Sequence, residues 1–315
     1  MKKKAIIISL SGKKLTIEEK KMLSKKNPWG IILFKRNIES LKQIRLLVKD
    51  IKRSVNNNNF PILIDEEGGN VCRLSNFLDN KIYSQSFFGK IFEGNKNLGL
   101  ELYRNYIHSI SSVLRSIGVN INTVPVLDIF KPKTHNILRG RCFSKNIDTI
   151  SILGNECIES YKKNKIGTII KHIPGHGEAK VDSHKKLPVI KKSYSSLIKD
   201  DFAPFKNKKS YFAMTAHILY SDIDSVNVAT HSKNLIKNII RKKIGFKGIL
   251  ISDDISMKAL KYDLVTNAKK SLEAGCNLVL HCSGNIDETK RLLDELPFID
   301  YFTAKKTSEF YKFLG

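Results

Sequence analysis

The sequence has few cysteines and no long apolar run. Its five cysteines are an odd number and include no CxxC pair, so they indicate neither a disulfide framework nor a zinc ribbon. No apolar run approaches the roughly 20 residues that a membrane-spanning helix needs. The N-terminal stretch MKKKAIIISLSGKKL has no small-x-small cleavage site, so it fits a first strand better than a signal peptide. We therefore expect a cytoplasmic protein with reduced thiols and no membrane partner.

Acidic residues are also scarce. Thirty Asp and Glu residues stand against 55 Lys and Arg residues, and the formal net charge is +25. Such a charge is found in proteins that bind nucleic acids, but here the basic pairs are spread along the whole chain and form no evident groove-binding element. We interpret the excess as a solvated surface, expect no nucleic-acid partner, and expect the field to favour anionic substrates at low salt.

No Pro/Gly/Ser linker, internal repeat or low-complexity block divides the chain, so residues 1–315 are expected to form a single domain. Short apolar runs alternate with longer amphipathic stretches. Several of the runs are apolar at consecutive positions, as strands buried on both faces must be. The expected strands are residues 5–11, 29–34, 60–65, 119–124, 166–171, 211–217, 248–253 and 277–281.

The stretches between these strands have helical patterns. Residues 16–26 open with a capping box, Thr16 followed three residues later by Glu19. Residues 37–55 and 98–118 carry apolar side chains at helical spacing, and residues 232–245 and 263–275 each end in glycine just before a strand. Eight strands with intervening helices predict an α/β protein with one (β/α)8 barrel; a doubly wound sheet is the alternative.

Four expected strands end in charged or titratable residues. These residues are Asp65, the pair Lys171-His172, His217, and the pair Asp253-Asp254. In a barrel the active site lies at the C-terminal ends of the strands, so the four ends predict one shared polar pocket. Because successive strand residues point to opposite faces, we expect only one aspartate of the pair to face that pocket, and the other to pack against or hydrogen-bond the surrounding scaffold; the periodicity does not say which.

The stretch KHIPGHGEAKVDSH, residues 171–184, concentrates histidines and carboxylates. His172 and His176 are four apart, but Pro174 and Gly175 prevent the single helix face on which a zinc-binding HExxH pair sits, so a metal site is weakly indicated. In Asp182-Ser183-His184 a carboxylate two residues from an imidazole would fix its tautomer and support acid/base chemistry. The other interpretation of this pair is a loop stabilised by an Asp–His hydrogen bond.

Together these motifs resemble glycoside hydrolase family 3, in particular its bacterial single-domain β-N-acetylglucosaminidase branch. The similar segments occur in family order over nearly the whole chain: IDEEGGNVCRL (64–74), VPVLDI (124–129), GRCFS (140–144), KHIPGHGEAKVDSH (171–184), MTAHILY (214–220), IGFKGILISDDISMKAL (244–260) and SLEAGCNLVL (271–280).

The resemblance implies a retaining exo-acting β-N-acetylglucosaminidase of cell-wall recycling. Its substrate would be a small carbohydrate, a peptidoglycan fragment in which N-acetylglucosamine is linked to an anhydro-muramyl peptide. Asp253 would match the nucleophile, His184 the acid/base and Asp182 its partner. The residues that match sugar-binding positions are Asp65, Arg73, Arg141, Lys171 and His172. No cofactor or metal is implied, and we expect a monomer.

Three other functions stay open at the level of sequence. A histidine acid/base becomes neutral when it has given up its proton, so it would not repel phosphate, and a phosphorylase acting on β-N-acetylglucosaminides is possible. A barrel that has lost catalysis and only binds sugar or nucleic acid is the second. The third is a metal-dependent hydrolase that uses His172, His176 and His184.

Overall fold

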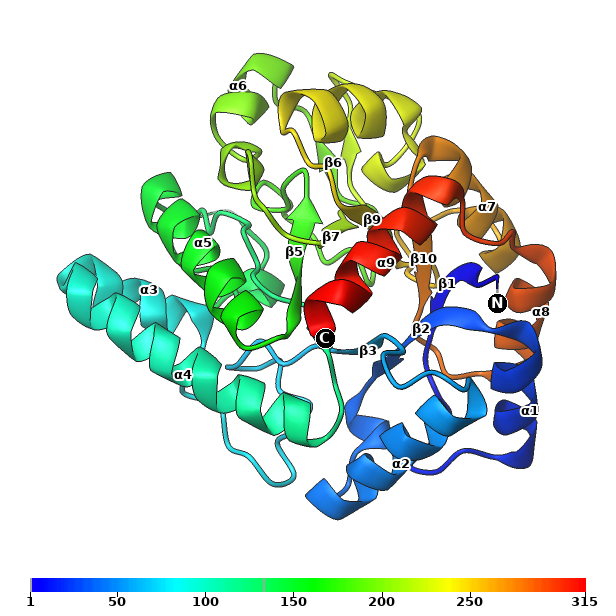
Figure 1. Cartoon of the computed structure of the whole chain (residues 1–315). Helices are drawn as coiled ribbons and strands as arrows, with labels where there is room; N and C mark the ends of the chain where they lie inside the picture. The colour runs from blue at the N-terminus through cyan, green and yellow to red at the C-terminus, as the bar shows by residue number, and fades with distance from the viewer. Residues whose placement is uncertain (1, 133) are drawn as a thin grey trace.

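Eight parallel strands close into a barrel in the computed structural model, which describes residues 2–132 and 134–315 (Figure 1). Around the barrel the order is β1-β10-β9-β7-β5-β4-β3-β2. Because the first strand pairs with the last, the predicted (β/α)8 barrel is confirmed and the doubly wound alternative is wrong. The strands are β1 (Lys4–Ile8), β2 (Pro28–Leu33), β3 (Ile62–Ile64), β4 (Ile121–Asn122), β5 (Gly167–Ile173), β7 (Phe212–Thr215), β9 (Ile249–Asp254) and β10 (Leu278–His281).

Helices surround the barrel and begin where the sequence offers capping residues. The capping box of Thr16 and Glu19 starts the first helix as predicted. The stretch 232–245 contains a π-helix, η5 (Leu235–Lys243), where the sequence pattern indicated an ordinary helix. The α-helices are α1 (Ile17–Lys26), α2 (Leu41–Ser54), α3 (Gln85–Gly94), α4 (Lys96–Ser116), α5 (Ile147–Lys163), α6 (Tyr194–Lys199), α7 (Leu264–Ala274), α8 (Ile286–Glu295) and α9 (Tyr301–Leu314).

Alternation along the strands divides the apolar core in two. In β9, Ile249 and Ile251 belong to the cluster inside the barrel, whereas Leu250 belongs to the larger cluster between barrel and helices. Both layers are fully buried, which explains why the strands are apolar at consecutive positions.

Helix α9 covers the N-terminal end of the barrel and crosses it in Figure 1, where it is red. Its Phe310 ring packs edge-on against Phe212 of β7, with 5.1 Å between ring centroids. The Trp29 indole N–H of β2 donates to Thr307 Oγ1 of α9 at 2.8 Å. The barrel is thus sealed at this end, and its C-terminal end is left for a site.

A long segment follows β5, and its far end is held by a short strand pair. Residues 174–188, which we call the β5–β6 loop, lead into β6 (Val189–Ile190), which pairs in parallel with β8 (Leu219–Tyr220).

Within the described residues, no helix combines the length and apolarity needed to cross a membrane.

Candidate active site

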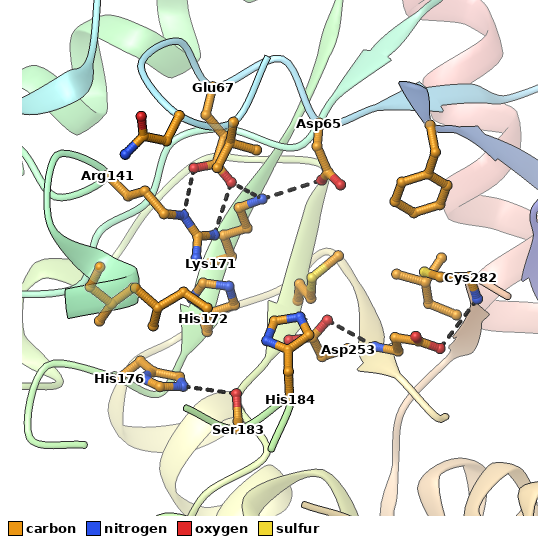
Figure 2. A pocket seen from close by; sticks show the side chains of 18 of the residues that line it. Asp65, Glu67, Arg141, Lys171, His172, His176, Ser183, His184, Asp253 and Cys282 are labelled. Carbon is orange, nitrogen blue, oxygen red and sulfur yellow. Dashed lines mark hydrogen bonds and ion pairs between the residues drawn. The ribbon is translucent and has the colours of Figure 1, made fainter. Parts of the chain in front are cut away.

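A cavity of about 550 Å³ opens at the C-terminal ends of the strands. Asp65 follows β3, Lys171 and His172 end β5, and Asp253 ends β9, and all four line the cavity. Arg73 and Arg141, from the segments after β3 and β4, line it too. Figure 2 shows five of these side chains approaching one space from separate elements: Asp65, Arg141, Lys171, His172 and Asp253. The structure therefore brings together every sugar-binding residue expected from the resemblance.

A buried ionic cluster forms the wall on the β3–β5 side. Arg141 donates to both carboxylate oxygens of Glu67, at 2.8 and 2.9 Å, and Lys171 Nζ lies 2.5 Å from Glu67 Oε1 (Figure 2). Arg73 Nη2 pairs with Asp65 Oδ2 at 2.9 Å, and Lys171 Nζ lies 3.4 Å from Asp65 Oδ1. These bidentate and charge-assisted bonds hold the donors rigidly at the cavity wall.

The cations of the cluster keep both carboxylates ionised. Burial by itself raises the pKa of Asp65 and Glu67. For Asp65 the charges of Lys171 and Arg73 outweigh burial and hold the pKa well below its usual range. For Glu67 the charges of Arg141 and Lys171 lower the pKa to about 2. At neutral pH the wall therefore presents charged acceptors and charged donors together.

Both aspartates at the end of β9 line the cavity, so the expectation that only one would face it is wrong. The register of β9 against β10 shifts there: Leu278 is opposite Ile251, but Leu280 is opposite Asp254. The extra residue in β9 breaks the alternation of the strand.

Their hydrogen bonds nevertheless distinguish the two aspartates. Asp254 accepts from the N–H and hydroxyl of Ser256 and from the N–H of Cys282. The Asp253 carboxylate accepts only from the N–H of Asp254, at 2.8 Å, among the described residues. Burial raises the pKa of Asp253, but His217, His172 and that N–H lower it more, so the carboxylate is ionised and has free lone pairs.

His217 does not line the cavity, although the sequence pattern placed it with the other strand ends. It is fully buried behind β9. Its Nε2–H donates to the carbonyl of Asp254 at 3.0 Å, and its Nδ1 accepts from the hydroxyl of Thr230 at 2.7 Å. Burial lowers its pKa, so a neutral His217 fixes the backbone that presents the two aspartates.

The β5–β6 loop carries Asp182 and His184 to the cavity. His184 lines the cavity with its side chain 60% exposed, whereas the Asp182 side chain is 10% exposed. Asp182 Oδ1 accepts from both the backbone N–H and the Nδ1–H of His184, each at 2.9 Å. Because a carboxylate only accepts, the proton sits on Nδ1 and Nε2 is free toward the cavity.

Ser183, between these two residues, links the loop to its surroundings. Its carbonyl accepts from the N–H of Ala259, in the segment that follows β9, at 3.2 Å. Its hydroxyl lies 3.3 Å from His176 Nε2 (Figure 2). The loop is therefore attached both to its own first turn, at His176, and to the segment that follows β9.

Asp128 holds the first turn of this loop through hydrogen bonds to its carboxylate. Its carboxylate accepts from Nδ1–H of His172 at 2.7 Å and from the N–H of His176 at 2.8 Å. Burial lowers the pKa of His176 to about 4, with a further lowering by His172. His176 is therefore neutral and serves to shape the loop.

The three histidines considered for a metal are each engaged separately: His172 with Asp128, His176 with Ser183 and His184 with Asp182. The residues that the structure describes contain no group of three or more His, Cys, Asp or Glu positioned to hold a metal ion. The ligand geometry thus gives no support to the metal-dependent reading.

Two residues of the site were not expected from the sequence, Glu67 and Asp128. Glu67 had a usable signal, because it is two residues from Asp65 and extended residues two apart share a side. Asp128 lies six residues beyond the end of β4 (Ile121–Asn122), so the rule that looks for polar residues at strand ends does not find it.

The chain is similar to known glycoside hydrolases over nearly its whole length. A family profile described as "Glycosyl hydrolase family 3 N terminal domain" matches residues 2–300. A protein from Psychromonas ingrahamii named beta-hexosaminidase is 33% identical over 284 residues, which are 88% of this chain and 82% of that protein. Another beta-hexosaminidase, from Actinobacillus succinogenes, is 31% identical over 299 residues, 92% of this chain and 84% of that protein.

Solved structures are similar over the whole barrel. NagZ from Neisseria gonorrhoeae, in complex with N-trifluoroacetyl-D-glucosamine, superimposes with a TM-score of 0.88 at 27% identity and covers 100% of this chain and 90% of its own. A glycoside hydrolase family 3 β-N-acetylglucosaminidase from Paenibacillus sp. has a TM-score of 0.84 at 26% identity, covering 98% of this chain and 59% of its own.

Proposed function

Since the chain belongs to glycosyl hydrolase family 3 and is a glycoside hydrolase of the beta-hexosaminidase group, we propose that it is a retaining exo-β-N-acetylglucosaminidase. One observation carries the proposal: a free, ionised carboxylate, Asp253, and an imidazole fixed by a carboxylate, His184, line the same cavity. The first fits a nucleophile and the second an acid/base.

In this mechanism Asp253 attacks the anomeric carbon and forms a covalent glycosyl-enzyme. The His184 imidazolium protonates the leaving oxygen through Nε2, and the neutral ring then takes a proton from the attacking water. Asp182 accepts from Nδ1–H throughout, which keeps the ring in one orientation and stabilises its charged form. Asp253 is ionised because nearby histidines and an N–H lower its pKa, so it needs no base of its own.

The ionic cluster is the proposed binding site for the terminal sugar. Asp65 and Glu67 supply acceptors for hydroxyl groups, and Arg73, Arg141 and Lys171 supply donors, all fixed by their mutual bonds. The Nε–H of Arg73 is buried and has no partner among the described residues, so it has a hydrogen bond to give to a sugar oxygen.

We further propose that the natural substrate is a peptidoglycan fragment, a terminal β-linked N-acetylglucosamine on an anhydro-muramyl peptide, and that the protein acts in the cytoplasm in cell-wall recycling. The resemblance of the sequence motifs to the cell-wall-recycling branch of the family supports this, as does a formal net charge of +25, which favours the carboxylates of such peptides.

The substrate assignment is tested with p-nitrophenyl glycosides. The p-nitrophenyl β-N-acetylglucosaminide should be cleaved at least about a hundredfold faster, in kcat/KM, than the β-glucoside, because only the former presents the N-acetyl group to the cluster. Equal cleavage, or a preference for the β-glucoside, would refute the assignment.

Phosphorolysis is a second candidate, favoured by the histidine acid/base. Once it has released its proton, His184 is neutral and does not repel phosphate as a spent carboxylate would. The products formed with and without phosphate separate the two reactions. Hydrolysis gives free N-acetylglucosamine in both cases, whereas a phosphorylase gives the 1-phosphate and a phosphate-dependent rate.

A further inference from the structure

A fully buried carboxyl group, that of Asp201, lies beneath the start of the β5–β6 loop and has no part in the chemistry proposed above. Asp201 follows α6 and is 0% exposed. Neither of its carboxyl oxygens has a hydrogen-bond partner within the described residues. Burying a polar group without a partner is costly, so a group in this position needs a reason to be there.

The carboxyl group packs directly on the main chain of the loop at two glycines. A Cβ placed on Gly175 would lie 2.8 Å from Asp201 Oδ2, and one placed on Gly177 would lie 2.6 Å from Asp201 Oδ1. Both distances are shorter than real Cβ atoms allow, so only glycine lets the chain approach Asp201 this closely. Each carboxyl oxygen thus supports one of the two glycines that flank His176.

The same turn is held on its other sides by polar groups. The carbonyl of Gly175 accepts from the Tyr220 hydroxyl, and the carbonyl of Gly177 accepts from the Thr134 hydroxyl. The N–H of His176 donates to Asp128. Because Ser183 lies against His176, a displacement of this turn is passed on to the segment that contains His184.

The surroundings of Asp201 are rich in negative charge. Burial is the main cause that raises its pKa; the Lys131 ammonium opposes this, and Asp128, Glu178 and Asp200 add to it, giving about 8. Lys131 forms ion pairs with both Glu178 and Asp200, and the same two carboxylates also pair with Lys192. Tyr220 and Cys142 also face this region; burial raises the pKa of each well above its ordinary value, so both stay neutral.

We propose that Asp201 is a positioning residue for the β5–β6 loop: its uncharged carboxyl group fixes the turn at Gly175–Gly177 and so holds His184 at the cavity. Ionisation would put a second buried anion beside Asp128 with no partner, and the turn would be displaced to admit water or a cation. That His184 is the acid/base rests on the proposed function. That Asp201 fixes the turn at Gly175–Gly177 does not.

Hydrogen–deuterium exchange of the wild-type protein tests the structural part without any turnover. After correction for intrinsic rates, residues 174–186 should lose protection as the pH rises toward about 8, by at most about tenfold for each pH unit, and the loss should level off above about 8, while the barrel strands keep their protection. Unchanged protection of the loop over this range would overturn the proposal, whether or not the protein cleaves a glycoside.

Kinetics of three variants test the consequence for His184. Asp201→Asn keeps the shape but does not ionise. Its kcat should stay within about threefold of the wild-type value at pH 7, and it should lack the additional decline of kcat above pH 8 that we expect from ionisation of Asp201 in the wild type, beyond any decline caused by catalytic groups common to both proteins. Asp201→Ala should lower kcat at least about tenfold with a smaller change in KM, because the sugar-binding cluster is not on the loop.

Asp200→Asn is the matched control, since it removes a carboxylate one residue away that pairs with Lys131 near the surface. It should retain the alkaline decline of the wild type. The inference fails if Asp201→Asn declines with pH as the wild type does, or if Asp201→Ala has the wild-type kcat. If the Asp201→Ala variant does not fold, the Asp201→Asn variant and the hydrogen–deuterium exchange experiment still test the proposal.

Discussion

Replacing Glu67 with glutamine removes one charge from the buried cluster and leaves its shape unchanged. The Glu67 side chain is 1% exposed and accepts from Arg141 at 2.8 and 2.9 Å and from Lys171 at 2.5 Å. With Asp65 and Arg73, the cluster holds three cations and two carboxylates, so the variant would leave three cations with one carboxylate. Lys171 (3% exposed) and Arg141 (13% exposed) cannot turn to solvent for compensation.

The loss of one partner from a buried ion pair costs about 3–5 kcal/mol of unfolding free energy, because the remaining charge stays buried. Unfolding entropy is about 2.1 cal/mol/K per residue, or roughly 0.7 kcal/mol/K for a chain of 315 residues. The melting temperature of Glu67→Gln should therefore fall by about 4–8 °C. The KM for the N-acetylglucosaminide should rise as well, because Arg141 and Lys171 lose their common anchor.

Thermal and urea unfolding of the two proteins measure this effect, with Glu295→Gln as the control. Glu295 also accepts from a lysine at 2.8 Å, but the two side chains are 49% and 45% exposed, so its replacement should leave the melting temperature unchanged. If Glu67→Gln melted with the wild type and the control, the argument that this carboxylate holds the cluster together would be refuted.

Three further outcomes follow from the site. The low pKa of Glu67, about 2, means that its stabilising contribution is complete above its unfolded value of about 4.5 and is lost as the pH falls toward 2; acid titrations of unfolding should be flatter for Glu67→Gln, and equal slopes would contradict this. Asp253→Ala should lower kcat at least about 10⁴-fold with an unchanged melting temperature, and wild-type turnover would exclude Asp253 as nucleophile. Exhaustive chelation should leave activity intact, and a loss that zinc restores would revive the metal-dependent reading.

Most of the fold could be predicted from the sequence, because strands buried on both faces are apolar at consecutive positions and can be recognised locally. The run 248–253 predicted a strand that the structure has at Ile249–Asp254, one residue away. The run 119–124 yielded a strand of only two residues, β4, although the N–H groups of Asn120 and Thr123 on either side of it still donate to the carbonyls of Ile62 and Ile64. The π-helix η5 was not predictable, since its apolar spacing fits an ordinary helix as well.

The site was predictable at three strand ends where a polar residue follows an apolar run, those of Asp65, Lys171 and Asp253, but the same rule failed at His217, which does not line the cavity. It was not predictable where neighbouring residues of one type have different partners. Glu66 and Glu67 look alike in the sequence, and both are buried. Yet Glu66 accepts from the nearby N–H groups of Arg73 and Leu74, whereas Glu67 meets Arg141, 74 residues away.

The two aspartates at the end of β9 are also adjacent residues of one type with different partners, but for a different reason. Strand alternation predicts that one of two adjacent residues faces the cavity, and that rule fails because the register against β10 slips by one residue there. What separates Asp253 from Asp254 is the number of donors each meets: one N–H for the former, and three donors from Ser256 and Cys282 for the latter. A carboxylate whose lone pairs are already used is a poor nucleophile. The hydrogen-bonding capacity left over, which only the assembled barrel determines, is therefore the reason to propose Asp253 rather than Asp254 as the nucleophile.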